Sequence, residues 1–141
     1  MTVAAANGGV LSWDTQLTGD YTLRVCKGYR LPDGGMVAGS GSSWPHCYTY
    51  IQWLIHQQGE APSLEGGSLL IVRPDYSHWL AEEGGIYPLI GTINAIGCGA
   101  QAALLGMNSG MSPAEAVASV CRLDAYCSEP IQTMRLLKRK K

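Results

Sequence analysis

Three side chains near the start of the chain have the chemistry of a hydrolytic nucleophile and its partners: Thr2, Asp14 and Lys27. Removal of Met1 would leave Thr2 with a free α-amine beside its hydroxyl, so one residue would supply both nucleophile and general base. A free α-amine has an ordinary pKa of about 7.7–8.0, and a nearby cation lowers that pKa toward neutrality. Because many chains begin with Met-Thr and make no use of it, this hypothesis depends on what the rest of the chain supplies.

Composition indicates one domain over residues 1–141, in which the basic residues 138–141 form a solvated tail. Apolar residues make up 46% of the chain and charged residues 15%, below the roughly 25% charged residues of ordinary soluble domains. Together with 18 glycines, this composition predicts buried sheet and subunits that hide surface in a closed homo-oligomer. A net charge of −1 gives no electrostatic reason to expect a nucleic-acid partner.

Neither a membrane segment nor a metal site is expected. No apolar run approaches the roughly 18 residues of a membrane span and no signal peptide is recognised. The cysteine count is odd and paired C-x-x-C spacing is absent, which predicts reduced thiols in a cytoplasmic protein rather than disulfides or a zinc site. The histidines His46, His56 and His78 lack metal-ligand spacing, so no metal or cofactor is predicted. The five cysteines are Cys26, Cys47, Cys98, Cys121 and Cys127.

The elements that must position these residues begin with a hairpin. Asn7-Gly8-Gly9 between two apolar segments is a strong hairpin signal, so a strand that starts at the N-terminus should hold Thr2 in place. Tight turns then predict a meander, followed by a helix at 43–58 that Ser43 caps and Pro45 starts. Strands of this half are predicted at residues 3–6, 10–13, 22–25, 28–31 and 36–38.

The second half has more strands, then two helices and a closing strand. Ser112-Pro113-Ala114-Glu115 is a capping box with proline at the first helical position, and it fixes the start of the last helix. Because strands are grouped instead of alternating singly with helices, a doubly wound parallel sheet is disfavoured. We predict an α+β fold, a four-layer αββα sandwich of two antiparallel sheets with one helical layer reduced to the helix at 43–58. Further strands are predicted at residues 68–72, 77–80, 86–89, 92–96 and 131–137.

These motifs resemble the proteasome β-type subunits and the peptidase of the bacterial two-component ATP-dependent protease, which are N-terminal-nucleophile hydrolases. The resemblance covers almost the whole chain. Thr2 lies where the family has its catalytic threonine, Asp14 begins a segment similar to the family's Asp-x-Gln-x-Thr, and Lys27 matches the lysine beside the nucleophile. Gly41 lies where a backbone N–H of the family forms the oxyanion hole, with Gly39 as the alternative alignment.

Two segments of the C-terminal half carry the resemblance further. Ala95-Ile96-Gly97-Cys98-Gly99 resembles the family's Ala-Ile-Gly-Ser-Gly, and Asp124-Ala125-Tyr126-Cys127 resembles its Asp-Ala-Tyr-Ser, with cysteine for serine each time. In the family these groups hydrogen-bond around the threonine amine and hydroxyl, which assigns Cys98, Asp124 and Cys127 to the site. A thiol is a weaker donor and acceptor than a hydroxyl. The resemblance also implies that Cys98 and Cys127 lie nearer each other than to any other cysteine.

The resemblance implies a threonine-type peptidase that forms a homo-oligomeric ring and acts on peptides or unfolded proteins. An ATP-dependent AAA+ unfoldase is the partner that such rings admit. Family members have two helices between the oxyanion glycine and the next strand, whereas one helix and the loop at 59–67 fill that gap here. A docking surface for a partner ring is therefore expected to be reduced.

Two alternatives are open. A retained Met1 would block the amine and leave an inactive structural or binding subunit. The same fold also hosts amide hydrolases that act on small molecules. Taken singly, Asp14 and Lys27 are an ordinary ion pair and Gly41 is a turn glycine, but their order and spacing together favour the peptidase.

Overall fold

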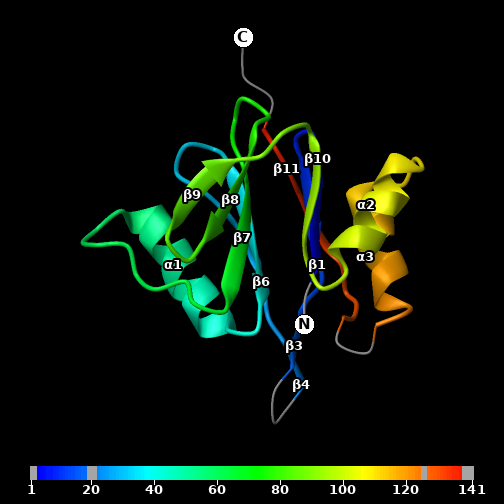
Figure 1. The fold of residues 1–141 in the computed structure, drawn as a ribbon, viewed down its shortest axis with the longest axis horizontal. Coiled ribbons are helices and arrows are strands. Elements are labelled where there is room, and N and C mark those ends of the chain that lie inside the picture. The colour runs from blue at the N-terminus through cyan, green and yellow to red at the C-terminus, as the bar shows by residue number, and fades with distance from the viewer. Residues whose placement is uncertain (1–2, 19–21, 125–126, 138–141) are drawn as a thin grey trace.

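The computed structural model describes residues 3–18, 22–124 and 127–137, which form two antiparallel sheets, a two-stranded ribbon and three helices (Figure 1). The four-stranded sheet has the order β10-β1-β2-β11, where β1 is Val3–Asn7, β2 is Val10–Trp13, β10 is Ile93–Gly97 and β11 is Gln132–Arg135. The five-stranded sheet runs in sequence order through β5 (Gly28–Arg30), β6 (Met36–Gly41), β7 (Gly67–Val72), β8 (His78–Glu82) and β9 (Gly85–Pro88). The ribbon pairs β3 (Gln16–Thr18) with β4 (Thr22–Arg24), and the helices are α1 (Trp44–His56), α2 (Ala100–Asn108) and α3 (Pro113–Cys121). The α+β class predicted from the sequence is confirmed.

The N-terminal hairpin predicted from Asn7-Gly8-Gly9 is present. β1 and β2 pair antiparallel with Asn7 opposite Val10, and Gly8 has a φ of 56°, a left-handed conformation that glycine adopts without steric cost. On its other side β1 pairs antiparallel with β10, with Val3 opposite Gly97. Val3 is therefore fixed in a strand that has a neighbour on each side.

Alternate residues of β1 enter two different cores because successive side chains of a strand point to opposite faces. Ala4 and Ala6 belong to a buried cluster that includes residues of both sheets, among them Trp13 of β2 and Leu70 of β7. Val3 and Ala5 belong to a second cluster, together with Ala103 and Met107 of α2 and Ala116, Val117 and Val120 of α3. The four-stranded sheet therefore packs on the five-stranded sheet through one face and on α2 and α3 through the other.

α1 lies against the five-stranded sheet on the side away from the four-stranded sheet (Figure 1). Its buried residues Cys47, Tyr50 and Ile51 pack with Val37 of β6 and Ile71 of β7. In the described part of the chain, α1 is the one helix packed on this face. Residues 57–66, which lead from α1 to β7, contain neither helix nor strand.

The helix starts follow the sequence signals to different degrees. At α3 the capping box is complete: Ser112 Oγ accepts the Glu115 N–H at 3.1 Å, and Glu115 Oε1 accepts the Ser112 N–H at 3.3 Å. At α1, Ser43 occupies the N-cap position, but its side chain makes no capping hydrogen bond, so that part of the prediction is wrong. The Ser43 N–H instead donates to the carbonyl of Gly66 at 3.1 Å, which ties the start of α1 to the start of β7.

β6 is longer than the predicted strand at 36–38. It continues through Gly39 and Ser40 to Gly41, because these residues pair antiparallel with β7 in a register that places Gly41 opposite Gly67. Gly41 taken singly is typical of a turn, but the facing pair of Gly41 and Gly67 lets the two strands continue where side chains would collide. A Cβ on Gly41 would lie 2.3 Å from the carbonyl oxygen of Gly66.

Candidate active site

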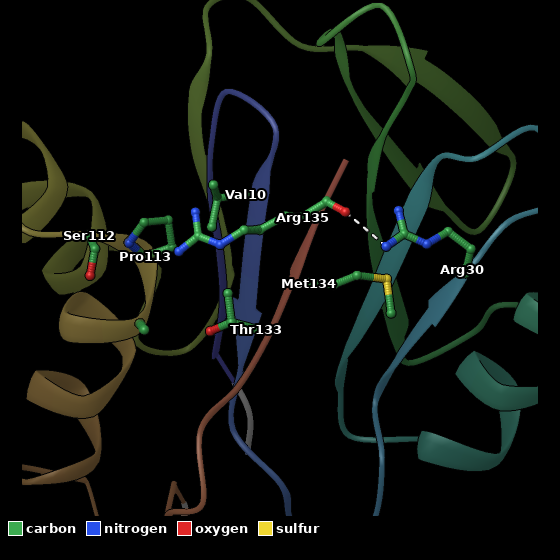
Figure 2. A pocket seen from close by; sticks show the side chains of 8 residues that line it. Val10, Arg30, Ser112, Pro113, Thr133, Met134 and Arg135 are labelled. Carbon is green, nitrogen blue, oxygen red and sulfur yellow. Dashed lines mark hydrogen bonds between the residues drawn. The ribbon is translucent and has the colours of Figure 1, made fainter. Parts of the chain in front are cut away.

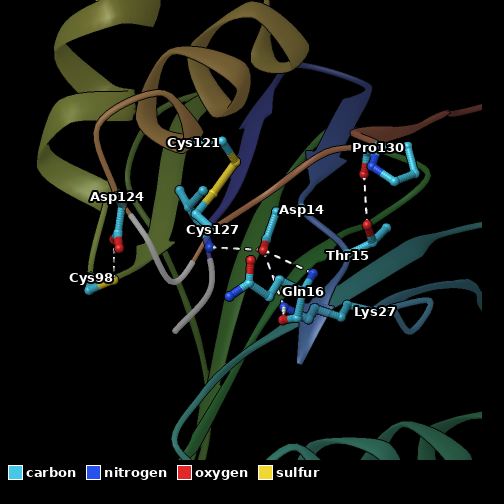
Figure 3. Close-up of a disulfide and its surroundings, with 10 residues drawn as sticks. Asp14, Thr15, Gln16, Lys27, Cys98, Cys121, Asp124, Cys127 and Pro130 are labelled. Carbon is cyan, nitrogen blue, oxygen red and sulfur yellow. Dashed lines mark hydrogen bonds and ion pairs between the residues drawn. A yellow bond between two sulfur atoms is a disulfide. The ribbon is translucent and has the colours of Figure 1, made fainter. Parts of the chain in front are cut away.

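Asp14 lies directly after β2 and is fully buried, with 0% of its surface exposed. Its carboxylate accepts three hydrogen bonds: Oδ1 from the Val3 N–H and from Lys27 Nζ, both at 3.3 Å, and Oδ2 from the Gln16 N–H at 3.2 Å. The Asp14 N–H in turn donates to the Val3 carbonyl at 3.4 Å. The carboxylate therefore joins the first residue of β1 to the lysine between β4 and β5 (Figure 3).

Lys27 is 1% exposed and forms the one ion pair found among the described residues, with Asp14. Its ammonium also donates to the carbonyl of Gln16. Burial lowers the pKa of Lys27 below its ordinary 10.5, and the charge and hydrogen bond of Asp14 act in the opposite direction. The next residue, Gly28, lets the Trp13 ring pack against the backbone beside the lysine, because a Cβ there would lie 2.3 Å from that ring. Asp14 and Lys27 are thus brought together as expected.

The proposed nucleophile Thr2 lies outside the described residues, so its expected hydrogen bonds to Lys27 and Asp14 stay a prediction. The bond network nevertheless reaches the adjoining residue. The Val3 nitrogen is the amide nitrogen of the Thr2–Val3 peptide bond, and its hydrogen bond ends on the same Asp14 oxygen that binds Lys27.

The two candidate oxyanion glycines differ in their surroundings. The Gly39 N–H donates to the Lys27 carbonyl at 2.9 Å, so it is used in holding β6 to β5. Gly41 is exposed, ends β6 and has a φ of 136°, a conformation that L-residues rarely adopt. Of the two alignments, this geometry favours Gly41.

Cys98 and Asp124 come together from separate parts of the chain. Cys98 follows β10, and Asp124 follows the end of α3. Cys98 Sγ donates a hydrogen bond to Asp124 Oδ2 at 3.3 Å (Figure 3). Burial, the hydrogen bond to Asp124 and the charge of Asp124 raise the pKa of the Cys98 thiol. Gly99 permits this approach, because a Cβ there would lie 2.4 Å from the Val120 side chain of α3. The two motifs recognised in the C-terminal half therefore meet, with Ala125 and Tyr126 outside the described residues.

Cys127 departs from its predicted place. It forms a disulfide with Cys121, with a Cα–Cα distance of 4.6 Å, so Cys98 is not its nearest cysteine and the expectation of reduced thiols is wrong for this pair (Figure 3). The physical reason is that the chain after α3 folds back on the helix end, where Cys127 joins the core beneath α3. In the disulfide state its sulfur has no proton to donate. Free thiols remain at Cys26 and Cys98, which are exposed, and at Cys47, which is buried.

Two groups at the site were missed in the sequence. The carbonyl of Gln16 accepts from Lys27, but a backbone acceptor leaves no trace in a residue pattern. Cys47 of α1 lies beneath Gly39 and Gly67 and donates to the Ser40 carbonyl at 3.5 Å. Burial raises the pKa of Cys47 and the nearby charge of Lys27 opposes that rise, so this thiol is an electrostatic neighbour of the lysine.

The pocket in Figure 2 is separate from this site. It has a volume of about 490 Å³ and lies at the Val10 end of β2, whereas Asp14 follows the other end of that strand. Arg30 donates across the space between the sheets to the carbonyl of Arg135 at 2.8 Å, and the Arg135 side chain extends toward Pro113. No group of three or more His, Cys, Asp or Glu side chains in the described residues could hold a metal ion. Within the same residues, no helix is long and apolar enough to cross a bilayer.

No protein-family model matches the sequence, and no curated protein matches it. Solved structures do match the fold over nearly its whole length. The Thiobacillus denitrificans protein BPH superposes with a TM-score of 0.64 at 17% identity, covering 99% of this chain and 100% of that one. Its complex with epoxomicin gives a TM-score of 0.65 at 16% identity, covering 98% of this chain and 100% of that one.

Eukaryotic HslV from Trypanosoma brucei superposes with a TM-score of 0.67 at 14% identity, covering 94% of this chain and 97% of that one. The agreement extends through both sheets and all three helices, because so little of either chain is left unmatched. The resemblance seen in the sequence motifs is thus present in three dimensions, and the chain has the fold of the HslV and BPH proteasome-like peptidase subunits.

Proposed function

We propose that this protein is a proteasome-like threonine peptidase in which Thr2, exposed by removal of Met1, is both nucleophile and base. The observation that carries the proposal is the buried contact of Asp14 with Lys27 and with the Val3 N–H. A buried lysine–carboxylate pair is costly to desolvate, and its stabilising value alone is a weak reason for its presence. A role in catalysis explains why this pair is hydrogen-bonded to Val3, the residue that follows Thr2.

In the proposed reaction, the Thr2 amine takes the Oγ proton, directly or through a water, as Oγ attacks a peptide carbonyl. The Lys27 ammonium favours the free-base form of that amine through its positive charge, and Asp14 holds the lysine in place. The Gly41 N–H would stabilise the oxyanion, a contribution of about 2.7–4 kcal/mol per donor in acyl-transfer enzymes. Cys98 and Asp124, and Cys127 when it is reduced, would complete the surroundings of the amine.

The wider properties of the proposal follow from the resemblance in fold. The packing of α1, the two sheets and α2 with α3 supports the four-layer sandwich of N-terminal-nucleophile hydrolases. HslV-like neighbours support a homo-oligomeric ring that cleaves peptides or unfolded proteins. A cytoplasmic location is part of the proposal and rests on the sequence alone. A partner AAA+ unfoldase would have to dock on a face where one helix covers the five-stranded sheet.

The test combines mass spectrometry with covalent labelling. We expect the purified protein to be one methionine lighter than the 15.1 kDa chain. Epoxomicin, which is present in the complex of the similar BPH structure, is expected to add once per chain and to stop the cleavage of short peptide amides. Thr2→Ala should lose both the adduct and the turnover, and adduct formation on a Thr2→Ala chain would refute the assignment.

Two other functions remain as outcomes of the same experiment. An intact mass that retains Met1, with neither adduct nor turnover, identifies an inactive structural or binding subunit. Turnover of small amides in place of peptides, lost in Thr2→Ala, identifies a small-molecule amide hydrolase on the same fold.

A further inference from the structure

A second pocket lies beside the disulfide, between the β3–β4 ribbon and the end of α3. It has a volume of about 380 Å³ and is lined by Arg24, Ala118, Cys121, Arg122, Ser128 and Glu129. Cys121 borders this pocket and is partly exposed, whereas its partner Cys127 is 3% exposed and packs in the core beneath α3. Only one sulfur of the bond is therefore open to attack from the pocket.

The charges around this pocket favour an anionic ligand. Arg24 and Arg122 contribute two exposed guanidinium groups, against the one carboxylate of Glu129. Arginine presents a planar set of N–H donors that matches carboxylate oxygens. In addition, Ser128 Oγ is buried without a hydrogen-bond partner among the described residues. This hydroxyl, beside the pocket, could therefore form a hydrogen bond with a bound ligand.

We propose that this pocket binds an anionic low-molecular-weight thiol, of the glutathione class, and that the Cys121–Cys127 disulfide is a reversible redox site. The ligand thiolate attacks Cys121 Sγ, a new S–S bond forms there, and the old bond breaks with its electron pair on Cys127, which takes a proton from solvent. A second thiolate attacks the ligand sulfur of this mixed disulfide and releases the Cys121 thiolate and the ligand disulfide. Two ligand thiols are oxidised as one protein disulfide is reduced.

The redox site is connected to the candidate active site through Thr15. The Thr15 N–H donates to the Ser128 carbonyl at 3.4 Å, and Thr15 Oγ1 donates to the Pro130 carbonyl at 3.0 Å. Thr15 directly follows Asp14, so the segment that leaves Cys127 is bonded to the neighbour of the carboxylate that holds Lys27. Reduction also returns a proton donor to Cys127, the position assigned to the surroundings of the Thr2 amine. This regulatory consequence rests on the proposed peptidase function, whereas the thiol exchange does not.

The exchange is tested on the full chain by following disulfide reduction with glutathione and, separately, with uncharged 2-mercaptoethanol. Arg24→Gln is expected to slow reduction by glutathione about two- to fivefold, the size of one solvent-screened ion pair, and to leave the rate with 2-mercaptoethanol unchanged. Arg24→Glu should slow reduction by glutathione further, and Arg24→Lys should restore the wild-type rate of that reaction. Arg135→Gln is the matched control, since this exposed arginine lines the other pocket.

Digestion after Glu115, Arg122 and Arg135 puts Cys121 and Cys127 on separate peptides, so the sulfur that carries the ligand can be identified. A mixed disulfide on Cys121 supports the proposal. A mixed disulfide only on Cys127, or equal effects of Arg24→Gln on both thiols, overturns it.

The connection to Asp14 is tested without any activity measurement. Hydrogen exchange at the Thr15 amide should differ between the oxidised chain and Cys121→Ser, which leaves Cys127 permanently unbridged. Identical exchange in the two chains removes the connection. If exchange differs and reduction raises peptide turnover, regulation is supported. If thiol exchange follows the arginines but no peptide is ever cleaved, the redox site stands and the proposed peptidase function fails.

Discussion

The Lys27 ammonium and the Val3 amide meet on one oxygen of Asp14, each at 3.3 Å, in a place where aspartate and lysine are 0% and 1% exposed. The same carboxylate oxygen therefore fixes the position of Val3 at the start of β1 as well as the position of the Lys27 ammonium. Changes at either residue should be visible in both folding stability and chemistry, and the two effects can be separated.

Removing one partner of the buried pair should destabilise the fold, because the remaining charge is left without compensation. We expect Asp14→Asn to lower the free energy of unfolding by about 3–5 kcal/mol. The double variant Asp14→Asn/Lys27→Met should recover part of that loss, because no charge is then buried and the amide oxygen of asparagine can still accept from a backbone N–H of Val3 or Gln16. Urea denaturation measures both. Peptide turnover should be absent in the double variant despite its stability, and wild-type turnover there would show that the pair is only structural.

Alkaline pH should stabilise the protein through Lys27. Burial lowers its pKa below 10.5, so between the folded-state pKa and 10.5 the unfolded chain binds more protons than the folded chain. The free energy of unfolding then rises with pH through that window. Burial raises the pKa of Tyr29 and Tyr50, which has the opposite effect at high pH. The prediction therefore concerns the difference between wild type and Lys27→Met in urea denaturation across pH, and a flat difference would contradict it.

Acid should weaken the contact between the two sheets through His78. This fully buried ring is bonded through Nε2 to the Gly8 carbonyl at 2.8 Å and through Nδ1 to Asn94 Nδ2 at 2.9 Å. Burial lowers its pKa below 6.5, so as pH falls below 6.5 the unfolded chain takes up the proton first and stability decreases. His78→Gln should lose this acid dependence of the melting temperature. His56→Gln, at an exposed position at the end of α1, serves as the control and should retain this acid dependence.

Gly41→Ala should cost more stability than Gly59→Ala. Both glycines have positive φ, but the Cβ at Gly59 would meet nothing within 4 Å, whereas at Gly41 it would lie 2.3 Å from the Gly66 carbonyl oxygen. Strain alone should cost about 1–2 kcal/mol at Gly59, and the collision adds to it at Gly41. Thermal unfolding compares the two. Turnover should be lost only in Gly41→Ala, because the collision displaces the Gly41 N–H, and equal turnover in the two variants would count against the oxyanion role of Gly41.

Substitutions at the nucleophile should change chemistry more than stability. Thr2→Ser retains hydroxyl and amine and should keep partial turnover. Cys98→Ser should preserve or raise the rate, since a hydroxyl is a better partner for Asp124 than a thiol. Steady-state kinetics on a short peptide amide measures both variants. If alkylation of thiols stops turnover in wild type while Thr2→Ala still cleaves, a cysteine is the nucleophile.

The parts of the fold that were predicted correctly are those encoded by neighbouring residues. Asn7-Gly8-Gly9 specifies a turn through its own backbone preferences, and Ser112 and Glu115 form their capping box within one helical turn. What was missed depends on distant segments. The Cys121–Cys127 bond requires the chain after α3 to turn back, and the extension of β6 to Gly41 requires Gly67 of β7 to lie opposite. The Asp14–Lys27 pair was found because the resemblance supplied the long-range contact that spacing alone lacks.

The position of β1 between β2 and β10 has a consequence for handling the protein. A strand with neighbours on both sides has no free edge, and its first described residue is already bonded to Asp14. Residues added before Thr2 would therefore begin within the candidate site instead of at a remote surface. An affinity tag or a fluorescent fusion belongs after Leu137, where β11 has ended, and a tag at the other end would itself act as a blocking group until a protease removed it.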